Sequence, residues 1–162
     1  MIAVVMGVSG AGKTAIGEAL ARELGWRFID ADDYHPQANV AKMAAGQPLD
    51  DEDRWPWLDR LNSLLKEEKH AVLACSALKE RYRSRLAKGI GRVEWVYLKG
   101  NFDLIRSRLA QRQHRYMPAS LLESQFAALE PPARAITVDV SADVSTCVSE
   151  ILAKLTSKIS RN

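Results

Sequence analysis

The fold of this chain is decided by residues 7–14, which read Gly7-Val8-Ser9-Gly10-Ala11-Gly12-Lys13-Thr14. The stretch fits the pattern G-x-x-x-x-G-K-[ST] at every fixed position. An apolar run at residues 2–6 precedes it, and Ile16, Leu20 and Leu24 follow with the four-residue spacing of a helix face. A strand, a glycine-rich loop and a helix in this order predict a phosphate-binding loop.

The residue types in this loop suit a triphosphate that is bound together with a divalent cation. Glycines allow the backbone to curl, so that consecutive N–H groups point at phosphate oxygens beside the positive end of the following helix. Lys13 is expected to reach the β- and γ-phosphates, and the Thr14 hydroxyl is expected to ligate Mg²⁺. The sequence therefore predicts a nucleoside triphosphate site over all eight residues, with ATP and Mg²⁺ as the expected ligands.

Length and composition favour a single domain over residues 1–162. Of the 162 residues 47% are hydrophobic, and no apolar run reaches the length of a membrane span. A cleaved signal peptide would remove the phosphate-binding loop, so none is expected. The net charge of +3 is too small to demand a nucleic-acid partner. Cys75 and Cys147 lack metal-binding spacing, so we expect reduced thiols in a cytoplasmic protein.

Apolar runs alternate with helical patterns along the rest of the chain. This alternation predicts an α/β fold, a five-stranded parallel sheet flanked by helices, which is the architecture of a small P-loop kinase. The expected strands are Ile2–Met6, Arg27–Asp30, Ala71–Ser76, Val93–Leu98 and Ala135–Val140. The expected helices lie near residues 13–24, 36–45, 53–68, 78–88, 102–112, 118–129 and 143–159.

The acid that helps to hold the metal is expected at the end of the second strand. The D-x-x-G and N-K-x-D motifs of GTPases are absent, and the third strand ends in Cys75-Ser76, where motor and transporter ATPases carry an acid. Continued strand alternation would point Asp30 and Asp32 to the same side. Asp30 is expected to hold Mg²⁺ through water, and Asp32 is expected to accept the proton of an attacking hydroxyl. The alternative is an acidic turn that caps the next helix.

Five further blocks follow the phosphate-binding loop. They are Asp32-Asp33-Tyr34-His35-Pro36-x-x-Asn39, Lys42-Met43-x-x-Gly46-x-Pro48-Leu49-x-Asp51-x-Asp53-Arg54-x-Pro56-Trp57-Leu58, Cys75-Ser76-Ala77-Leu78-Lys79-x-x-Tyr82-Arg83, Tyr97-Leu98-Lys99-Gly100 and Leu121-Leu122-x-Ser124-Gln125-Phe126-x-x-Leu129-Glu130-x-Pro132. Through these blocks, as far as about Pro132, the chain resembles the gluconokinase family of small P-loop kinases. The resemblance implies phosphorylation of D-gluconate at carbon 6 and a homodimeric protein.

A gluconate pocket needs cations for the carboxylate and mixed donors and acceptors for the hydroxyls. Arg54 follows an acidic turn, where a fixed guanidinium can grip a carboxylate through two hydrogen bonds. Lys79 and Arg83 follow the carboxyl end of the third strand, and the family pattern favours both as further carboxylate partners. Ser76 and the backbone amide of Ala77 are expected to bond substrate hydroxyls at the same turn.

Three aromatic side chains near this pocket leave alternatives open. His35 is a candidate for bonding substrate hydroxyls, although a histidine before proline is as often a structural turn partner. Trp55 and Trp57 either form an apolar wall under the substrate or belong to the core. Arg81 is expected to be a solvated helix residue.

Residues 106–117 are rich in arginine and are interpreted as a short lid. Arg108 and Arg112 are four residues apart and therefore share a helix face. Both are expected to contact the nucleotide, and Arg112 also to neutralise charge on the moving phosphoryl group. Arg115-Tyr116 departs from the His-Phe of the family pattern. Gln125 is a further candidate for contacting substrate hydroxyls or the lid.

The sequence thus predicts in-line transfer of a phosphoryl group from Mg²⁺-bound ATP to gluconate. One alternative is another small-molecule kinase of the shikimate kinase type, whose D-x-D resembles Asp30-Ala31-Asp32. A nucleic-acid end kinase is suggested by the basic clusters at 79–92 and 106–115, but the low net charge and the lack of interleaved aromatic residues argue against it. A nucleotide sensor without catalysis is disfavoured, because Lys13, Thr14 and both acids are present.

Overall fold

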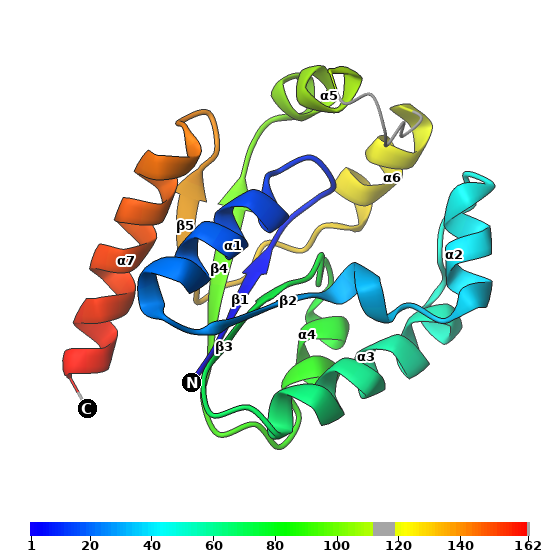
Figure 1. The fold of residues 1–162 in the computed structure, drawn as a ribbon. Coiled ribbons are helices and arrows are strands. Elements are labelled where there is room, and N and C mark those ends of the chain that lie inside the picture. Colours follow the sequence, from blue (N-terminus) through cyan, green and yellow to red (C-terminus); the bar gives the residue numbers. More distant parts are fainter. Residues whose placement is uncertain (112–118, 162) are drawn as a thin grey trace.

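The structure, a computed structural model, describes residues 1–111 and 119–161. Its strands are β1 (Ile2–Met6), β2 (Arg27–Asp30), β3 (Ala71–Ala74), β4 (Val93–Lys99) and β5 (Ile136–Asp139). Its helices are α1 (Lys13–Leu24), the 3₁₀ helix η1 (Ala31–Tyr34), α2 (Gln37–Ala44), α3 (Asp51–Lys66), α4 (Glu80–Ala87), α5 (Phe102–Ala110), α6 (Ala119–Ala128) and α7 (Val144–Ser160). The strands form one parallel sheet in the order β2-β3-β1-β4-β5 (Figure 1), so the expected five-stranded parallel sheet is confirmed.

The central strand β1 is apolar throughout because both faces of the sheet are covered. Ala3 and Val5 pack on one face, under α1 and α7. Ile2, Val4 and Met6 pack on the other face, under α3 and α4 (Figure 1). Successive side chains of a strand point to opposite faces, so one five-residue run supplies apolar groups to both halves of the core.

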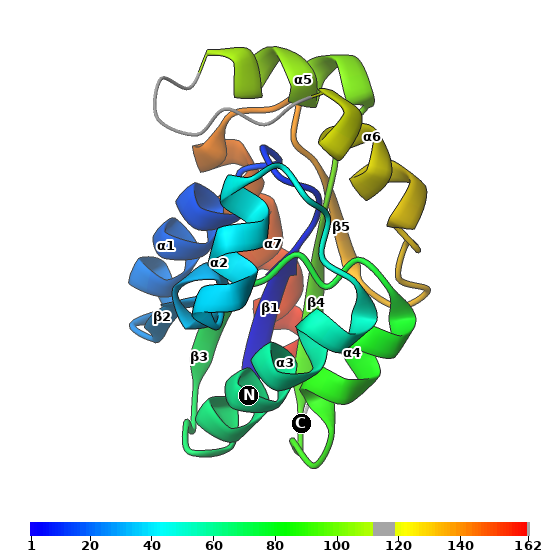
Figure 2. The same cartoon turned by 90° about the vertical axis from the view of Figure 1, so that its right-hand side faces the viewer.

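The strand order brings the functional segments to one edge of the sheet. The chain leaves β1 for β2 on one side of the sheet, whereas β4 and β5 lie on the other side of β1. Ligands of open α/β sheets bind beyond the carboxyl ends of the strands where the strand order reverses in this way. Helices α5 and α6 lie over that end of the sheet, and α2 flanks it (Figure 2).

Several element boundaries differ by a few residues from the sequence-based expectation, and two of these differences bear on the site. β3 ends at Ala74 instead of Ser76, and Ala77 in the loop that follows adopts a left-handed conformation with φ of 43°. Helix α3 begins at Asp51 instead of residue 53, because Asp50 and Asp53 cap each other's backbone N–H groups at 2.8 and 3.0 Å. The acidic run before Arg54 is therefore a helix N-terminus, where carboxylates are stabilised by the helix dipole.

Within residues 1–111 and 119–161 no helix is both long and apolar enough to cross a membrane. Cys75 and Cys147 are both buried and unpaired. Burial raises the pKa of the Cys75 thiol to about 12, so this thiol stays protonated at neutral pH.

Candidate active site

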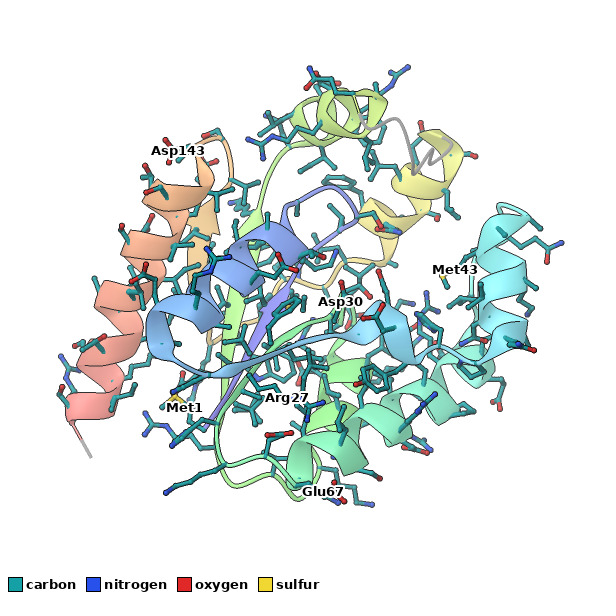
Figure 3. All side chains as sticks on the ribbon, viewed as in Figure 1. Met1, Arg27, Asp30, Met43, Glu67 and Asp143 are labelled. Carbon is teal, nitrogen blue, oxygen red and sulfur yellow. The ribbon has the colours of Figure 1, made fainter. Side chains whose placement is uncertain are left out.

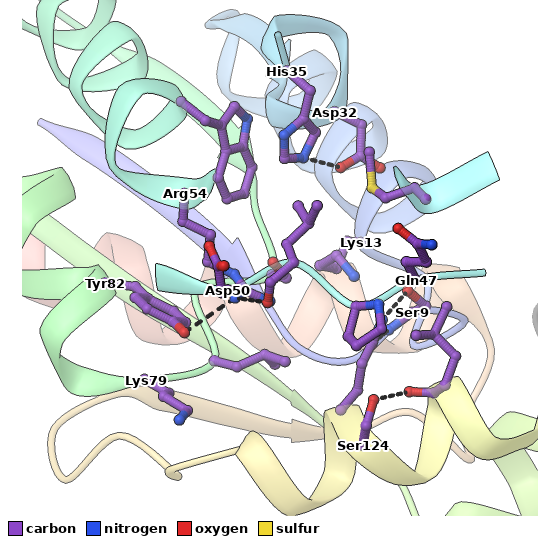
Figure 4. A pocket seen from close by; sticks show the side chains of 18 of the residues that line it. Ser9, Lys13, Asp32, His35, Gln47, Asp50, Arg54, Lys79, Tyr82 and Ser124 are labelled. Atoms are coloured by element: carbon purple, nitrogen blue, oxygen red, sulfur yellow. Dashed lines mark hydrogen bonds and ion pairs between the residues drawn. The ribbon is translucent and has the colours of Figure 1, made fainter. Parts of the chain in front are cut away.

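A cavity of about 750 Å³ opens at the carboxyl edge of the sheet (Figure 4). Its volume lies within the range of about 300–1,000 Å³ that is typical of small-molecule sites. The cavity brings together eleven of the predicted site residues, which are Ser9, Gly10, Gly12, Lys13, Thr14, Asp32, His35, Arg54, Ser76, Lys79 and Gln125. The predicted residues Gly7, Val8, Ala11, Asp30, Ala77, Arg83 and Arg108 are described but do not line it.

The phosphate-binding loop has a backbone that only glycine adopts readily. Gly10 and Gly12 have φ values of 83° and 98°, in the left-handed region. A Cβ atom on Gly10 would lie 2.7 Å from Cγ of Leu109, so α5 packs directly against the loop. The Lys13 ammonium donates to the carbonyl oxygens of Gly7 and Val8, both at 3.0 Å, which holds this cation over the loop.

Thr14 and Asp30 come together although 16 residues separate them in the chain. The Thr14 hydroxyl donates to Oδ2 of Asp30 at 3.1 Å, and the backbone N–H of Asp32 donates to Oδ1 of the same carboxylate at 3.0 Å. Figure 3 shows Asp30 at the end of β2. A hydroxyl beside a carboxylate offers the hard oxygen donors that Mg²⁺ prefers. The described residues hold no cluster of three or more His, Cys, Asp or Glu side chains fit for a metal, so such an ion would depend on phosphate oxygens and water.

Asp32 lines the cavity, but it lies in a 3₁₀ helix and not in the extended backbone that was expected. β2 ends at Asp30, so strand alternation does not apply, and Asp32 lies in the 3₁₀ helix η1 that Asp30 caps. The capping alternative is therefore correct for Asp30, which carries out this role in addition to its contact with Thr14. The Asp32 side chain is 58% exposed and lines the cavity, as a group that exchanges protons with a ligand must.

Arg54 is held at the cavity wall by a network that the sequence did not predict. One of its terminal nitrogens donates to the Tyr82 hydroxyl at 3.2 Å and to the carbonyl oxygen of Leu49, and its guanidinium lies 4.9 Å from the centre of the Tyr82 ring. The Tyr82 hydroxyl donates in turn to Asp51 at 2.6 Å. These contacts fix the direction of the Arg54 guanidinium, and both Arg54 and Tyr82 line the cavity.

Asp51 is the acidic end of the same network. Arg81 donates to its two oxygens at 2.6 and 3.0 Å, and this contact, followed by the Tyr82 hydroxyl, lowers the pKa of Asp51. Burial raises the pKa of Tyr82, so its hydroxyl remains a donor at neutral pH. Arg81, expected to be only solvated, is exposed but paired with Asp51.

The two predicted cations that follow β3 lie in different places, Lys79 at the cavity and Arg83 in the core. Lys79 lines the cavity together with Ser76. Arg83 instead is buried, and its two terminal nitrogens donate to the carbonyl oxygens of Ala77 at 2.7 Å and Glu130 at 2.8 Å. The physical reason is the face of α4, because Arg83 stands on the inward side of this helix. The structure thus puts Arg83 and Ala77 behind the cavity wall, where Arg83 supports the left-handed turn.

His35 and Trp57 form a stacked pair at the cavity. Their ring centres are 4.0 Å apart with 16° between the planes, and the Trp57 indole donates to the carbonyl oxygen of Ala31 at 2.7 Å. Trp57 is buried and also lines the cavity, so both alternatives for it hold together. Trp55 does not line the cavity and packs under the guanidinium of Arg85.

Gln125 of α6 makes two hydrogen bonds to Ser9 of the phosphate-binding loop. Its Oε1 accepts from the backbone N–H of Ser9 at 2.8 Å, and its Nε2 donates to the Ser9 hydroxyl at 3.0 Å. The predicted lid is covered only in part, since Arg112, Arg115 and Tyr116 lie outside the described residues.

Arg108 lies on α5 near the end of β5. The pKa of Asp139 is lowered mainly by hydrogen bonds with Ser141, and the charge of Arg108 makes a smaller contribution in the same direction. Arg108 does not line the cavity that holds Asp32.

Comparison with known proteins assigns the chain to a family. The family model described as shikimate kinase matches residues 9–159. A probable gluconokinase of Xenopus tropicalis is 47% identical, with 93% of this chain and 91% of that protein covered. The thermosensitive gluconokinase of Escherichia coli K12 is 43% identical over 91% of this chain and 83% of its own length.

A solved structure agrees with these relatives. The crystal structure of a gluconokinase from Sinorhizobium meliloti 1021 superposes with a TM-score of 0.89 at 42% identity, covering 95% of this chain and 90% of that one. The high identities over nearly the whole chain are more specific than the broad family model. The chain therefore belongs to the gluconokinase family of P-loop kinases.

Proposed function

We propose that this protein transfers the γ-phosphoryl group of ATP to the C6 hydroxyl of D-gluconate, with Mg²⁺ as the cofactor. The observation that carries the proposal is the shared cavity, in which Lys13, Asp32 and Arg54 line the same space. This arrangement combines a phosphate cation, a carboxylate for the acceptor hydroxyl and a guanidinium for an acidic substrate. Family membership narrows the acceptor to gluconate.

The nucleotide half of the site is built from the phosphate-binding loop and the start of α1. The backbone N–H groups of residues 7–14 would face the phosphate oxygens, and Lys13 would stabilise negative charge between the β- and γ-phosphates. Thr14 and Asp30 would hold Mg²⁺, Asp30 through a water molecule, and the ion when bound neutralises charge on the phosphate oxygens. We assign Arg108 to the adenine side of the nucleotide and Arg112 to the moving phosphoryl group.

The acceptor half of the site is built from η1, α3 and the loop after β3. Arg54 and Lys79 bind the carboxylate of gluconate, and Ser76 bonds one of its hydroxyls. Arg83 supports this half from behind through the Ala77 carbonyl oxygen, which leaves Arg54 as the main carboxylate partner. With the carboxylate held there, the far end of the six-carbon chain extends toward Asp32.

The chemical step follows from these positions. Asp32 accepts the proton of the C6 hydroxyl while the oxygen of this hydroxyl attacks the γ-phosphorus. The attack is in line with the bond to the leaving oxygen of ADP. Lys13 stabilises the charge that gathers on the leaving group, because the loop carbonyls hold its ammonium in place before the reaction begins. The apolar side chains of Met43, Leu109 and Leu121 line the same cavity and limit the access of water, which would compete with the hydroxyl.

An acceptor panel tests the proposal. ADP release with Mg²⁺-bound ATP is measured for D-gluconate, shikimate, nucleoside monophosphates and a 5′-hydroxyl oligonucleotide. We expect turnover with gluconate alone and a product that 6-phosphogluconate dehydrogenase oxidises. Turnover with a different acceptor would show that the protein is a kinase, but it would refute the assignment of Arg54 and Lys79 to the carboxylate of gluconate. Absence of turnover with all of them would refute the proposed function.

The setting of the protein is a further part of the proposal. We infer a cytoplasmic location, which the two unpaired buried cysteines support. We also propose a homodimer on family resemblance, and sedimentation equilibrium measures that state directly.

A further inference from the structure

The side chain of Asn39 on α2 is buried and makes two hydrogen bonds through the same nitrogen. Its Nδ2 lies 2.8 Å from the backbone carbonyl oxygen of Asp53 and 3.2 Å from Nδ1 of His35. A carbonyl oxygen only accepts hydrogen bonds, so the atom that faces Asp53 must be the amide nitrogen and not the amide oxygen. The orientation of the Asn39 amide is thereby determined by chemistry.

This orientation determines the tautomer of His35. Since Nδ2 of Asn39 donates, Nδ1 of His35 must present its lone pair, and a neutral ring then carries its proton on Nε2. Burial lowers the pKa of His35, which keeps the ring neutral, and Arg54 acts in the same direction against the opposing charge of Asp32. The face of the ring is covered by Trp57.

The protonated Nε2 of His35 lies near the carboxylate of Asp32. The distance from Nε2 to Oδ1 of Asp32 is 3.9 Å, too long for a direct hydrogen bond, and both side chains line the cavity (Figure 4). A donor and an acceptor at this spacing suit a group that both accepts and donates. An alcohol oxygen does so, because it accepts from Nε2–H while its own proton is directed at Asp32. An ammonium has no lone pair to offer, and a carboxylate would be repelled by Asp32.

We propose that Asn39 is a positioning residue that holds His35 as the Nε2–H tautomer, and that His35 binds a substrate hydroxyl beside Asp32. In this role His35 always donates a hydrogen bond through Nε2 and does not act as a base. A hydroxyl is selected at this place because His35 offers a donor and Asp32 offers an acceptor. The hydroxyl is the C6 group or its neighbour on C5. This second half of the proposal rests on the proposed function, whereas the tautomer does not.

The tautomer is tested by two-bond ¹H–¹⁵N correlation spectra of the ¹⁵N-labelled protein. The chain has three histidines, so the His35 signals are assigned by their loss in His35→Gln, with His70 as an internal reference. We expect the pattern of a neutral ring with an unprotonated Nδ1 at pH 7, and in Asn39→Asp a shift toward protonated Nδ1, because a carboxylate there requires a donor. A neutral Nδ1–H ring or a charged imidazolium in the wild type would overturn the proposal.

Hydroxyl binding is tested by a pair of His35 variants. Phenylalanine keeps the stacking on Trp57 but has no donor, so His35→Phe should raise the KM for gluconate on the order of tenfold and leave the KM for ATP within about twofold. Glutamine offers an amide N–H near the place of Nε2, so His35→Gln should recover most of that loss. His70, which stacks on Trp26 and does not line the cavity, provides the control His70→Gln, expected to match the wild type.

The outcomes of these experiments separate the two proposals. Equal gluconate KM values for His35→Phe and the wild type, with folding verified by thermal melting, would overturn the role of His35. A wild type that does not phosphorylate gluconate would refute the proposed function and hydroxyl binding with it, while the correlation spectrum would still decide the tautomer.

Discussion

Removal of the Arg54 guanidinium provides a quantitative test of carboxylate recognition. In Arg54→Met the apolar stem is retained and the cation is lost. A hydrogen bond to a charged group contributes about 1.5–3 kcal/mol, and 1.4 kcal/mol corresponds to a factor of ten. We therefore expect the kcat/KM for gluconate to fall roughly 10- to 150-fold, mainly through KM.

A neutral acceptor separates carboxylate binding from a general disturbance of the site. Arg54 also anchors Tyr82 and Leu49, so its loss loosens the cavity wall for any substrate. D-glucitol has the same six-carbon chain with a hydroxymethyl group in place of the carboxylate. The preference of the wild type for gluconate over glucitol should fall by about the same factor in Arg54→Met, leaving the part that Lys79 supplies, as measured by ADP release at saturating ATP.

The matched control lies on the same helix. Arg60 stacks on Tyr34 at 5.1 Å, is exposed and does not line the cavity, so Arg60→Met should retain the wild-type preference. Equal losses for gluconate and glucitol in Arg54→Met would refute the reasoning, because they would show that Arg54 only supports the wall.

The remaining predictions concern Asp32 as the catalytic base, the hydrogen bonds between Gln125 and Ser9, and the buried thiol of Cys75. Asp32→Asn should reduce kcat by about 10²–10⁴ while the calorimetric Kd for ATP stays within about twofold, and a near-normal kcat would exclude Asp32 as the base. Gln125→Leu removes two neutral hydrogen bonds to Ser9 and should lower the free energy of unfolding in urea by about 1–3 kcal/mol, whereas Ser124→Ala, on the same helix, should cost less than about 0.5 kcal/mol. Similar losses of unfolding free energy in both variants would contradict a stabilising contact between Gln125 and Ser9. Because the pKa of Cys75 is raised from 9.0 to about 12, its protonated state stabilises the fold fully below pH 9, and the contribution declines above pH 9 by up to about 1.4 kcal/mol per pH unit. The wild type should therefore lose stability faster than Cys75→Ala between pH 9 and 10.5, and parallel curves would contradict the raised pKa.

Local sequence signals predicted the parts of the site that depend on short-range geometry. The order of an apolar run, a glycine loop and a helix predicted β1, the phosphate-binding loop and α1 with their observed bounds. The alternation of apolar runs and helical patterns predicted the parallel sheet. The meeting of Thr14 and Asp30 followed from this fold, because the carboxyl ends of parallel strands lie at one edge of the sheet.

Side-chain direction and long-range pairing were beyond the reach of these signals. Lys79 and Arg83 look equivalent as cations after a strand, yet the start of α4 at Glu80 turns Arg83 into the core. The extended run expected through Asp32 is replaced by a 3₁₀ turn, which the cap from Asp30 favours. The grip of Gln125 on Ser9 joins residues 116 positions apart, and no local pattern indicates such a contact.

The network around Arg54 shows the same limitation. Asp51 and Tyr82 both stood in blocks that resemble the family, but their sequence positions gave no sign that they pair with each other. Their contact depends on the packing of α3 against α4, a tertiary relationship. A helical-face argument for α4 would have placed Tyr82 and Arg83 toward the core, since Leu86 follows Tyr82 by four positions and Arg83 by three.

The position of the transferred phosphate tests the central claim most directly. In the proposed complex the carboxylate of gluconate binds at Arg54 and the far end of its carbon chain lies at Asp32, so the phosphoryl group should be attached to the terminal carbon. A ¹H–³¹P correlation spectrum of the product made from D-gluconate should couple the phosphorus to the two protons of C6. Coupling to a single proton on an inner carbon, or the absence of a phosphorylated product, would contradict the account.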